Sequence, residues 1–220
     1  MLAARSSAGA ATARTAPAAP TKHTILFLAA NPSGTTQVAL DREARSIQVE
    51  LERITWRDRF ELVTRWAAEP LDLLREMRRL KPTVVHFSGH GGQQGLGFHR
   101  EGGAGVQVVS TDALQESFGA AGSSVKVVVL SACFSTAHAQ ALLAHVDCVV
   151  GTNGTLLDEV ARNFAIGFYG GCGDQQSVAA AFKQGCAAVS PSGVLAVARP
   201  ELMTRPGVDA SKLVLAADPE

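Results

Sequence analysis

The stretch KVVVLSACFSTAHAQ, residues 126–140, decides the fold of this chain. Its apolar run Val127–Leu130 is typical of a strand that is buried on both faces of a parallel sheet. The run stops at Ser131-Ala132-Cys133, and a helical pattern begins a few residues later. The cysteine therefore stands at the carboxyl end of a core strand, which is where open α/β sheets bind their ligands.

Strand-like and helix-like segments alternate on both sides of this stretch. Apolar runs predict strands over residues 25–30, 60–66, 83–88, 125–130 and 148–151. Apolar residues repeated every three or four positions predict helices over residues 40–54, 70–77, 111–118, 136–145, 158–169 and 177–189. Two late apolar runs, 194–198 and 213–216, are expected as strands or core packing. The alternation predicts an α/β fold with a mostly parallel central sheet and helices on both faces.

The bulk composition is that of an ordinary globular protein, with 220 residues, 46% hydrophobic residues and a formal net charge of +0 at pH 7. This length suits one domain, predicted over residues 23–220, after an Ala-rich leader at 1–22. We expect the leader to be disordered, although its composition also resembles a transit peptide. Without a basic excess or an apolar stretch of roughly 18 residues, we expect neither nucleic acid nor a membrane as a partner.

The spacing of the cysteines argues against a metal site and against a disulfide framework. The four cysteines are Cys133, Cys148, Cys172 and Cys186, and no two of them form a CxxC pair. A zinc cage is therefore not expected, and neither is another metal or cofactor. All four lie in strand-like or helix-like patterns, which favours reduced thiols in the cytoplasm over a disulfide framework.

Two of the predicted strands end in residues suited to acyl transfer. The 83–88 strand leads into Gly89-His90-Gly91-Gly92, and the 125–130 strand leads to Cys133. If these strands are neighbours, His90 and Cys133 face each other at the same rim of the sheet. A histidine within hydrogen-bond reach can take the thiol proton, and a helix that starts just after the cysteine favours the thiolate. The backbone amides of Gly91, Gly92 and Cys133 are then expected to bind an oxyanion.

Each half of this pattern has an ordinary alternative, because a single cysteine in an apolar run is usually core and a histidine in a Gly-rich loop usually belongs to a turn. Their coincidence after two buried strands favours a catalytic pair. Of the other histidines, His86 is expected in the core with hydrogen bonds, whereas His138 and His145 are expected at the surface. The Gly-rich run GHGGQQGLG (89–97) is not predicted to bind phosphate, because it lacks Gly-Lys-Ser/Thr.

HFSGHGG at 86–92 together with VLSACFS at 129–135 resembles the CHAT-domain family, prokaryotic relatives of caspases and separase. The resemblance covers most of residues 24–190. It implies a caspase-like three-layer sandwich and an endopeptidase in which His90 is the general base and Cys133 the nucleophile. Caspases carry Gln-Ala-Cys with a glycine two residues past the cysteine. This chain has serines at both of those positions, which fits the CHAT branch and leaves cleavage after aspartate unsupported.

Two acidic residues are predicted to bind substrate. Asp41 follows the first predicted strand and Asp158 follows the fifth, and by the logic of this fold these loops flank the pocket for the residue before the scissile bond. A carboxylate there favours Arg or Lys at that substrate position. The alternative is that both residues are helix caps, since each stands near a predicted helix start.

The predicted function is a cysteine endopeptidase that cuts a specific protein partner. Similar proteins are often kept inactive until a partner or fused module signals, commonly in bacterial conflict or cell-death systems, so we expect a regulatory protein partner. Loops at 100–103 and 199–206 are predicted processing sites, and the first is favoured because proline follows both Arg199 and Arg205. The alternatives are a non-catalytic interaction domain of the same fold and a flavodoxin-like nucleotide binder.

Overall fold

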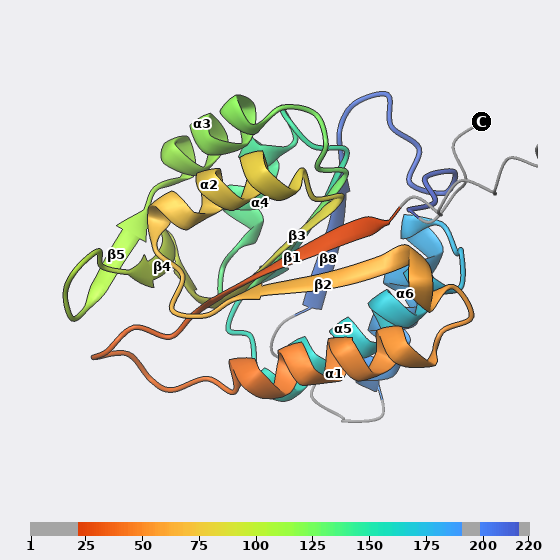
Figure 1. Cartoon of the computed structure of the whole chain (residues 1–220), viewed down its shortest axis with the longest axis horizontal. Coiled ribbons are helices and arrows are strands. Elements are labelled where there is room, and N and C mark those ends of the chain that lie inside the picture. The colour runs from red at the N-terminus through yellow and green to blue at the C-terminus, as the bar shows by residue number, and fades with distance from the viewer. Residues whose placement is uncertain (1–21, 191–198, 216–220) are drawn as a thin grey trace, which may run out of the picture.

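The computed structural model describes residues 22–190 and 199–215, which build a central sheet between two layers of helices (Figure 1). The strand order is β2-β1-β3-β6-β7-β8. Strands β2 to β7 in this order are parallel, and β8 runs antiparallel to β7. The strands are β1 (His23–Ala30), β2 (Phe60–Arg65), β3 (Val84–Gly92), β6 (Val127–Ser131), β7 (Cys148–Asn153) and β8 (Arg199–Thr204).

Helices cover both faces of the sheet, which confirms the predicted α/β sandwich (Figure 1). One face is covered by α1 (Leu40–Arg53), α5 (Asp158–Gly173) and α6 (Val178–Val189), and the other by α2 (Pro70–Leu80), α3 (Thr111–Ala121) and α4 (Thr136–Leu142). A short 3₁₀ turn (Arg57–Arg59) precedes β2. A hairpin is formed by β4 (Gly95–His99) and β5 (Val106–Val109), which pair antiparallel and extend from the end of β3.

The central strands are buried on both faces because each feeds two separate hydrophobic cores. In β1, Ile25 and Phe27 belong to the core beneath α1, α5 and α6, whereas Leu26 and Leu28 belong to the core beneath α2, α3 and α4. Alternate side chains of a strand point to opposite faces, so a strand covered twice must be apolar at nearly every position. This explains the continuous apolar runs that identify these strands in the sequence.

The C-terminal part differs from the expectations. Residues 199–206, predicted as a processing loop, are instead mostly the edge strand β8, and the prediction is wrong for this segment. Just past β8, the Arg205 amide donates to the Asp147 carbonyl and the Arg205 guanidinium pairs with the Asp147 carboxylate. Proline is tolerated at such an edge, which explains why the sequence suggested a loop. The predicted strand at 194–198 lies outside the described residues.

Two other expectations concern the ends of the chain and its surface. The predicted leader, residues 1–22, lies outside the described residues except for Lys22. Residues 101–104 form the exposed tip of the β4–β5 hairpin, where a processing site was predicted. In the described ranges, no helix combines the length and the apolar character that crossing a bilayer requires.

Candidate active site

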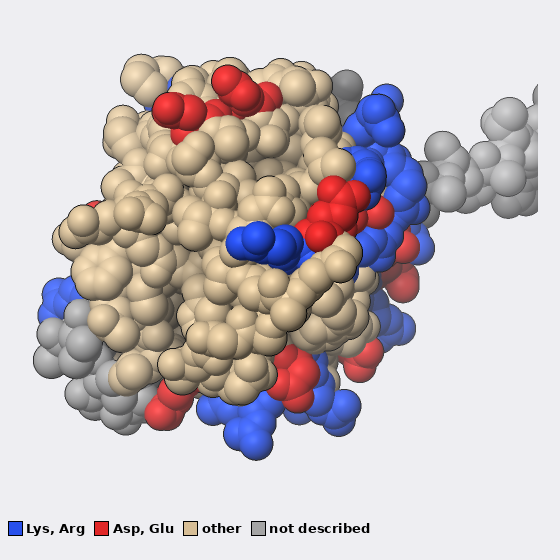
Figure 2. All heavy atoms as spheres, turned by 90° about the vertical axis from the view of Figure 1, so that its left-hand side faces the viewer, with Lys and Arg blue, Asp and Glu red and all other residues tan. Residues whose placement is uncertain are grey.

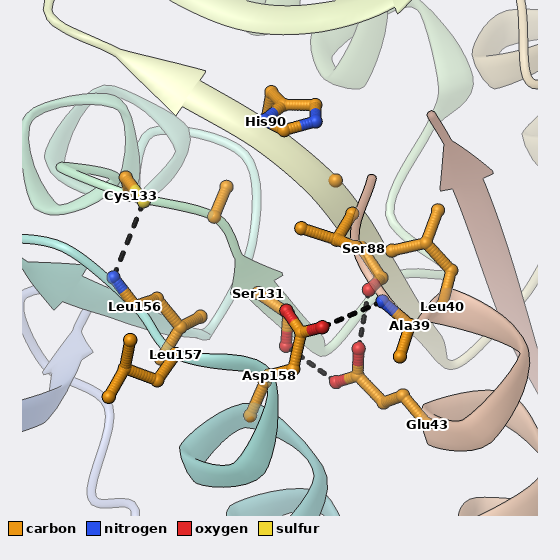
Figure 3. Close-up of a pocket in the computed structure, with 14 residues that line it drawn as sticks. Ala39, Leu40, Glu43, Ser88, His90, Ser131, Cys133, Leu156, Leu157 and Asp158 are labelled. Atoms are coloured by element: carbon orange, nitrogen blue, oxygen red, sulfur yellow. Dashed lines mark hydrogen bonds between the residues drawn. The ribbon is translucent and has the colours of Figure 1, made fainter. Parts of the chain in front are cut away.

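The register between β3 and β6 brings the predicted histidine and cysteine to one pocket. These strands are parallel neighbours, and Ser88 pairs with Ser131. His90 and Cys133 each lie two residues beyond this pair, so both side chains emerge at the carboxyl rim of the sheet. Both line the same pocket (Figure 3). The sequence prediction required this adjacency.

Glycine allows the two strand ends to touch. A Cβ atom on Gly91 would lie 2.4 Å from the Cys133 carbonyl oxygen and 2.9 Å from Ala132 Cβ. The backbone beside the histidine therefore packs directly on the backbone of the cysteine. Any larger residue at position 91 would force the two segments apart.

The turn that carries Cys133 is held from both sides and is locally strained. Phe134 has φ 53°, in the left-handed region, and its amide donates to the Gly154 carbonyl at 2.9 Å. The Ser135 hydroxyl donates to the Leu130 carbonyl and accepts from the Thr152 amide. A non-glycine residue in this region costs on the order of 1–3 kcal/mol and is typical of functional sites.

The thiol and the imidazole are close in the fold but are not bonded to each other. Cys133 Sγ accepts a hydrogen bond from the Leu156 amide at 3.3 Å (Figure 3). His90 Nε2 is buried and has no hydrogen-bond partner among the described residues. Catalytic hydrogen bonds are often long or absent before substrate binds, so this geometry is compatible with a resting site.

The pocket itself is narrow, with a volume of about 40 Å³. Leu156 and Leu157, from the loop between β7 and α5, and Leu40, from the start of α1, contribute apolar walls. Sites for whole small-molecule ligands are roughly 300–1,000 Å³, so these leucines leave little room beside Cys133.

A buried polar network forms part of the pocket wall. Its centre is Glu43 on α1, which is not among the site residues predicted from the sequence. This carboxylate is only 4% exposed. It accepts hydrogen bonds from the hydroxyls of Ser88 and Ser131, and its Oε1 lies 3.1 Å from His86 Nε2 (Figure 3 shows the two serine bonds). His86 Nδ1 lies 2.9 Å from the Tyr169 hydroxyl, which confirms the prediction of a hydrogen-bonded core histidine.

The network keeps Glu43 ionised. Burial alone would raise the pKa of Glu43, but the charge of His86 and the hydrogen bonds from His86, Ser88 and Ser131 offset it and lower the pKa below its ordinary value. The sequence did contain a signal for this residue. Glu43 lies between Leu40 and Ile47 at spacings of three and four, so it is a charged residue on the buried face of α1.

The two predicted substrate-binding carboxylates lie in different places. Asp158 lines the pocket with His90 and Cys133, and its Oδ2 accepts from the Ala39 amide at 2.8 Å (Figure 3). Because Ala39 is the N-cap residue of α1, Asp158 is a capping group as well as a pocket residue. Asp41 instead lines a separate hollow between α1 and β2, beside Trp66. The structure therefore does not bring Asp41 to this pocket.

Two histidines predicted at the surface, His138 and His145, are less exposed than expected. His138 is fully buried, so the prediction of a surface position is wrong, and His145 is half-buried. All four cysteines are free thiols. Burial raises the pKa of Cys148 to about 11, with a smaller effect from Asp147, and burial also raises the pKa of Cys172 and of Cys186.

Figure 2 looks onto the side of the molecule where the β4–β5 hairpin and the loop between β1 and α1 lie, and this face consists mainly of uncharged residues. A face of this kind has no strong field of one sign to steer a charged ligand. Among the described residues, no group of three or more His, Cys, Asp or Glu side chains is arranged to hold a metal ion.

A mostly parallel sheet between two helical layers, as found here, is a caspase-like fold. The caspase-1 structure of Spodoptera frugiperda shares this fold, with a TM-score of 0.56 and 11% identity over 91% of this chain and 94% of that one. The chain belongs to the CHAT-domain family, whose model matches residues 2–192.

Two curated relatives carry a matching region inside longer chains. One, from an unknown prokaryotic organism, is named a Roc-COR-CHAT protease and is 28% identical over 153 residues, which is 66% of this chain and 14% of the relative. The other, from Gillisia limnaea, is named a probable protease and is 25% identical over 148 residues, which is 66% of this chain and 26% of the relative. This chain therefore aligns with only a small part of each relative.

Proposed function

We propose that this protein is a cysteine endopeptidase in which His90 and Cys133 form the catalytic dyad. The observation that carries the proposal is the placement of both side chains in one pocket by the adjacent parallel strands β3 and β6. Family membership and the names of the two curated relatives support a protease.

The reaction follows from the chemistry of the pair. His90 takes the proton of Cys133, and the sulfur attacks the carbonyl carbon of the scissile peptide bond. The amides of Gly91 and Cys133, whose backbones are in contact, stabilise the oxyanion. The C–N bond then breaks, and His90 gives its proton to the departing amine. Water, deprotonated by His90, attacks the thioester and releases the acid and the thiol.

The described geometry supports a resting state that a partner activates. The Leu156 amide holds the sulfur, and Leu156 and Leu157 narrow the pocket. Moving this one loop would free the thiol and open the pocket together. A regulatory protein that binds beside it would therefore act as a switch, which fits a cytoplasmic enzyme of a bacterial defence or cell-death system.

Thiol alkylation tests the dyad without knowledge of the substrate. With iodoacetamide at about pH 6.5, below the ordinary thiol pKa of roughly 8.5, we expect Cys133 to react first. The other three cysteines should lag, because burial raises the pKa of each. His90→Ala should slow the reaction at Cys133 by about tenfold or more, since it removes the proton acceptor. Peptide mass spectrometry reports each site separately.

The same measurement distinguishes the alternative, a non-catalytic interaction domain with this fold. Two observations favour that alternative: the narrow pocket, and the absence of a hydrogen bond between His90 and Cys133. If Cys133 reacts as slowly as Cys186 in wild type and His90→Ala changes nothing, with the candidate partner present or absent, the dyad proposal is rejected.

A basic residue before the scissile bond is the proposed preference, with Asp158 as the recognising charge. Asp158→Asn keeps an oxygen that can cap Ala39 but removes the charge, so the two roles separate. In a peptide panel we expect kcat/KM for Arg and Lys substrates to fall by about tenfold or more, while uncharged substrates change little. Glu159→Gln, next to it but outside the pocket, is the control. Equal loss for all substrates would assign Asp158 to capping alone.

A further inference from the structure

We propose that His138 is a positioning residue that ties the segment carrying His90 to the turn carrying Cys133. The inference rests on the proposed function and adds a residue to its machinery. His138 lies on α4, the helix that begins just after the cysteine, and is fully buried. It touches neither the sulfur nor the base, and its effect passes through the backbone of Gly92.

The contacts of His138 join three segments. Its Nε2 lies 2.8 Å from the carbonyl oxygen of Gly92, two residues past His90. Its Nδ1 lies 2.7 Å from the hydroxyl of Thr111, the first residue of α3. One buried side chain thus links the end of β3, the start of α3 and the helix after the nucleophile.

The partners fix the tautomer of the ring. A carbonyl oxygen can only accept, so Nε2 must carry a proton and donate it to Gly92. In the neutral ring Nδ1 then accepts from the Thr111 hydroxyl. Thr111 therefore orients His138, much as a carbonyl or carboxylate orients a histidine in other sites.

The bond from His138 to the Gly92 carbonyl adds to the β3–β4 ladder, in which Gly92 pairs with Gly95, and ties the end of β3 to α4 as well. A Cβ on Gly92 would meet nothing within 4 Å, whereas one on Gly91 would collide with the backbone of Cys133. Gly91 is thus pressed on the cysteine, whereas the space beside the Gly92 Cα is open. The bond from His138 holds this segment in place. It thereby fixes the separation between the His90 imidazole and the Cys133 sulfur.

The test compares two substitutions at one position. His138→Leu removes the donor, whereas His138→Gln places an amide NH₂ near the position of Nε2. Hydrogen exchange of the backbone over residues 88–97 should be about tenfold faster in His138→Leu, because the Gly92 carbonyl loses its donor. Exchange in β1 should not change, and His138→Gln should restore most of the protection. His145→Gln, on a histidine without contact to this segment, is the matched control.

The second readout is the alkylation rate of Cys133, expected to fall about tenfold in His138→Leu, by about as much in Thr111→Val, and much less in His138→Gln. Unchanged exchange over 88–97 in His138→Leu overturns the inference, whatever the activity of the protein. Fast alkylation that depends on His90 but not on His138 overturns the positioning role and leaves the dyad intact. If Cys133 of the wild type is alkylated slowly, and His90→Ala does not change that rate, the proposed function is rejected instead. The exchange measurement still tests the link made by His138.

Discussion

Cys133→Ala is expected to abolish proteolysis, with kcat/KM lower by roughly 10⁴-fold or more, because no other group in the pocket can form the thioester. The measurement is incubation of wild type and variant with candidate partner proteins, followed by mass spectrometry of new termini. His90→Ala should lower the rate by roughly 10²- to 10⁴-fold, the usual contribution of a general acid–base group. Both variants should fold, since Cys133 and His90 are only half-buried.

Cys148→Ala provides the matched control for the loss of a thiol. Cys148 is fully buried in β7, so its substitution should lower stability but leave the chemistry unchanged in the folded fraction. A double variant without Cys133 and His90 should be no slower than Cys133→Ala, because the two residues act as one unit. New termini that persist in Cys133→Ala at the wild-type rate would rule out this cysteine as the nucleophile.

The central sheet could be predicted from the sequence because its signal is local. A strand such as β6, covered on both faces, must be apolar at successive positions. Such a run can be recognised without knowing which elements pack on it. His90 and Cys133 stand just after such strands. Because ligands bind at the carboxyl ends of parallel strands, this position makes both residues candidates for a functional site. The pairing of Ser88 with Ser131 shows that the two strand ends lie side by side, so both residues reach one pocket.

The edge strand β8 could not be predicted for the opposite reason. It is covered less completely than β6, carries Pro200 and includes exposed positions, so its composition is that of a loop. What makes it a strand is its pairing with β7, a contact between residues about fifty positions apart in the sequence. Periodicity within one segment does not report such pairing.

The polar residues of the site were misjudged because a charge or an imidazole is buried only when distant partners satisfy it. The sequence pattern predicts His138 at the surface, but its two ring nitrogens are paired with Gly92 and Thr111 in the fold. Glu43 was overlooked because its donors come from β3 and β6. Sequence distance hides both sets of partners; the helical spacing marks Glu43 as a charge on a buried face, but only the fold shows what pairs with it.

Glu43→Ala is expected to lower the free energy of unfolding by roughly 3 kcal/mol or more, because it removes the acceptor of several buried donors, each of which costs about 1–3 kcal/mol when left unpaired. The substitution leaves His86 without its carboxylate and the hydroxyls of Ser88 and Ser131 without an acceptor in the core. Urea unfolding at pH 7 measures the change. Glu52→Ala, an exposed residue of the same helix, should stay within about 0.5 kcal/mol of wild type.

The pH dependence of this difference gives an independent check on the charge of Glu43. The pKa of Glu43 is lowered in the folded protein, so the unfolded chain takes up the proton first as the pH falls. The stability that the ionised group contributes is therefore fully present above the unfolded pKa of about 4.3, and it is lost as the pH falls through that value toward the lower folded pKa. The gap between wild type and Glu43→Ala should accordingly narrow as the pH falls from about 5 toward 3. A gap that does not narrow between about pH 5 and pH 3 would mean that the hydrogen bonds of the network do not favour the carboxylate form of Glu43.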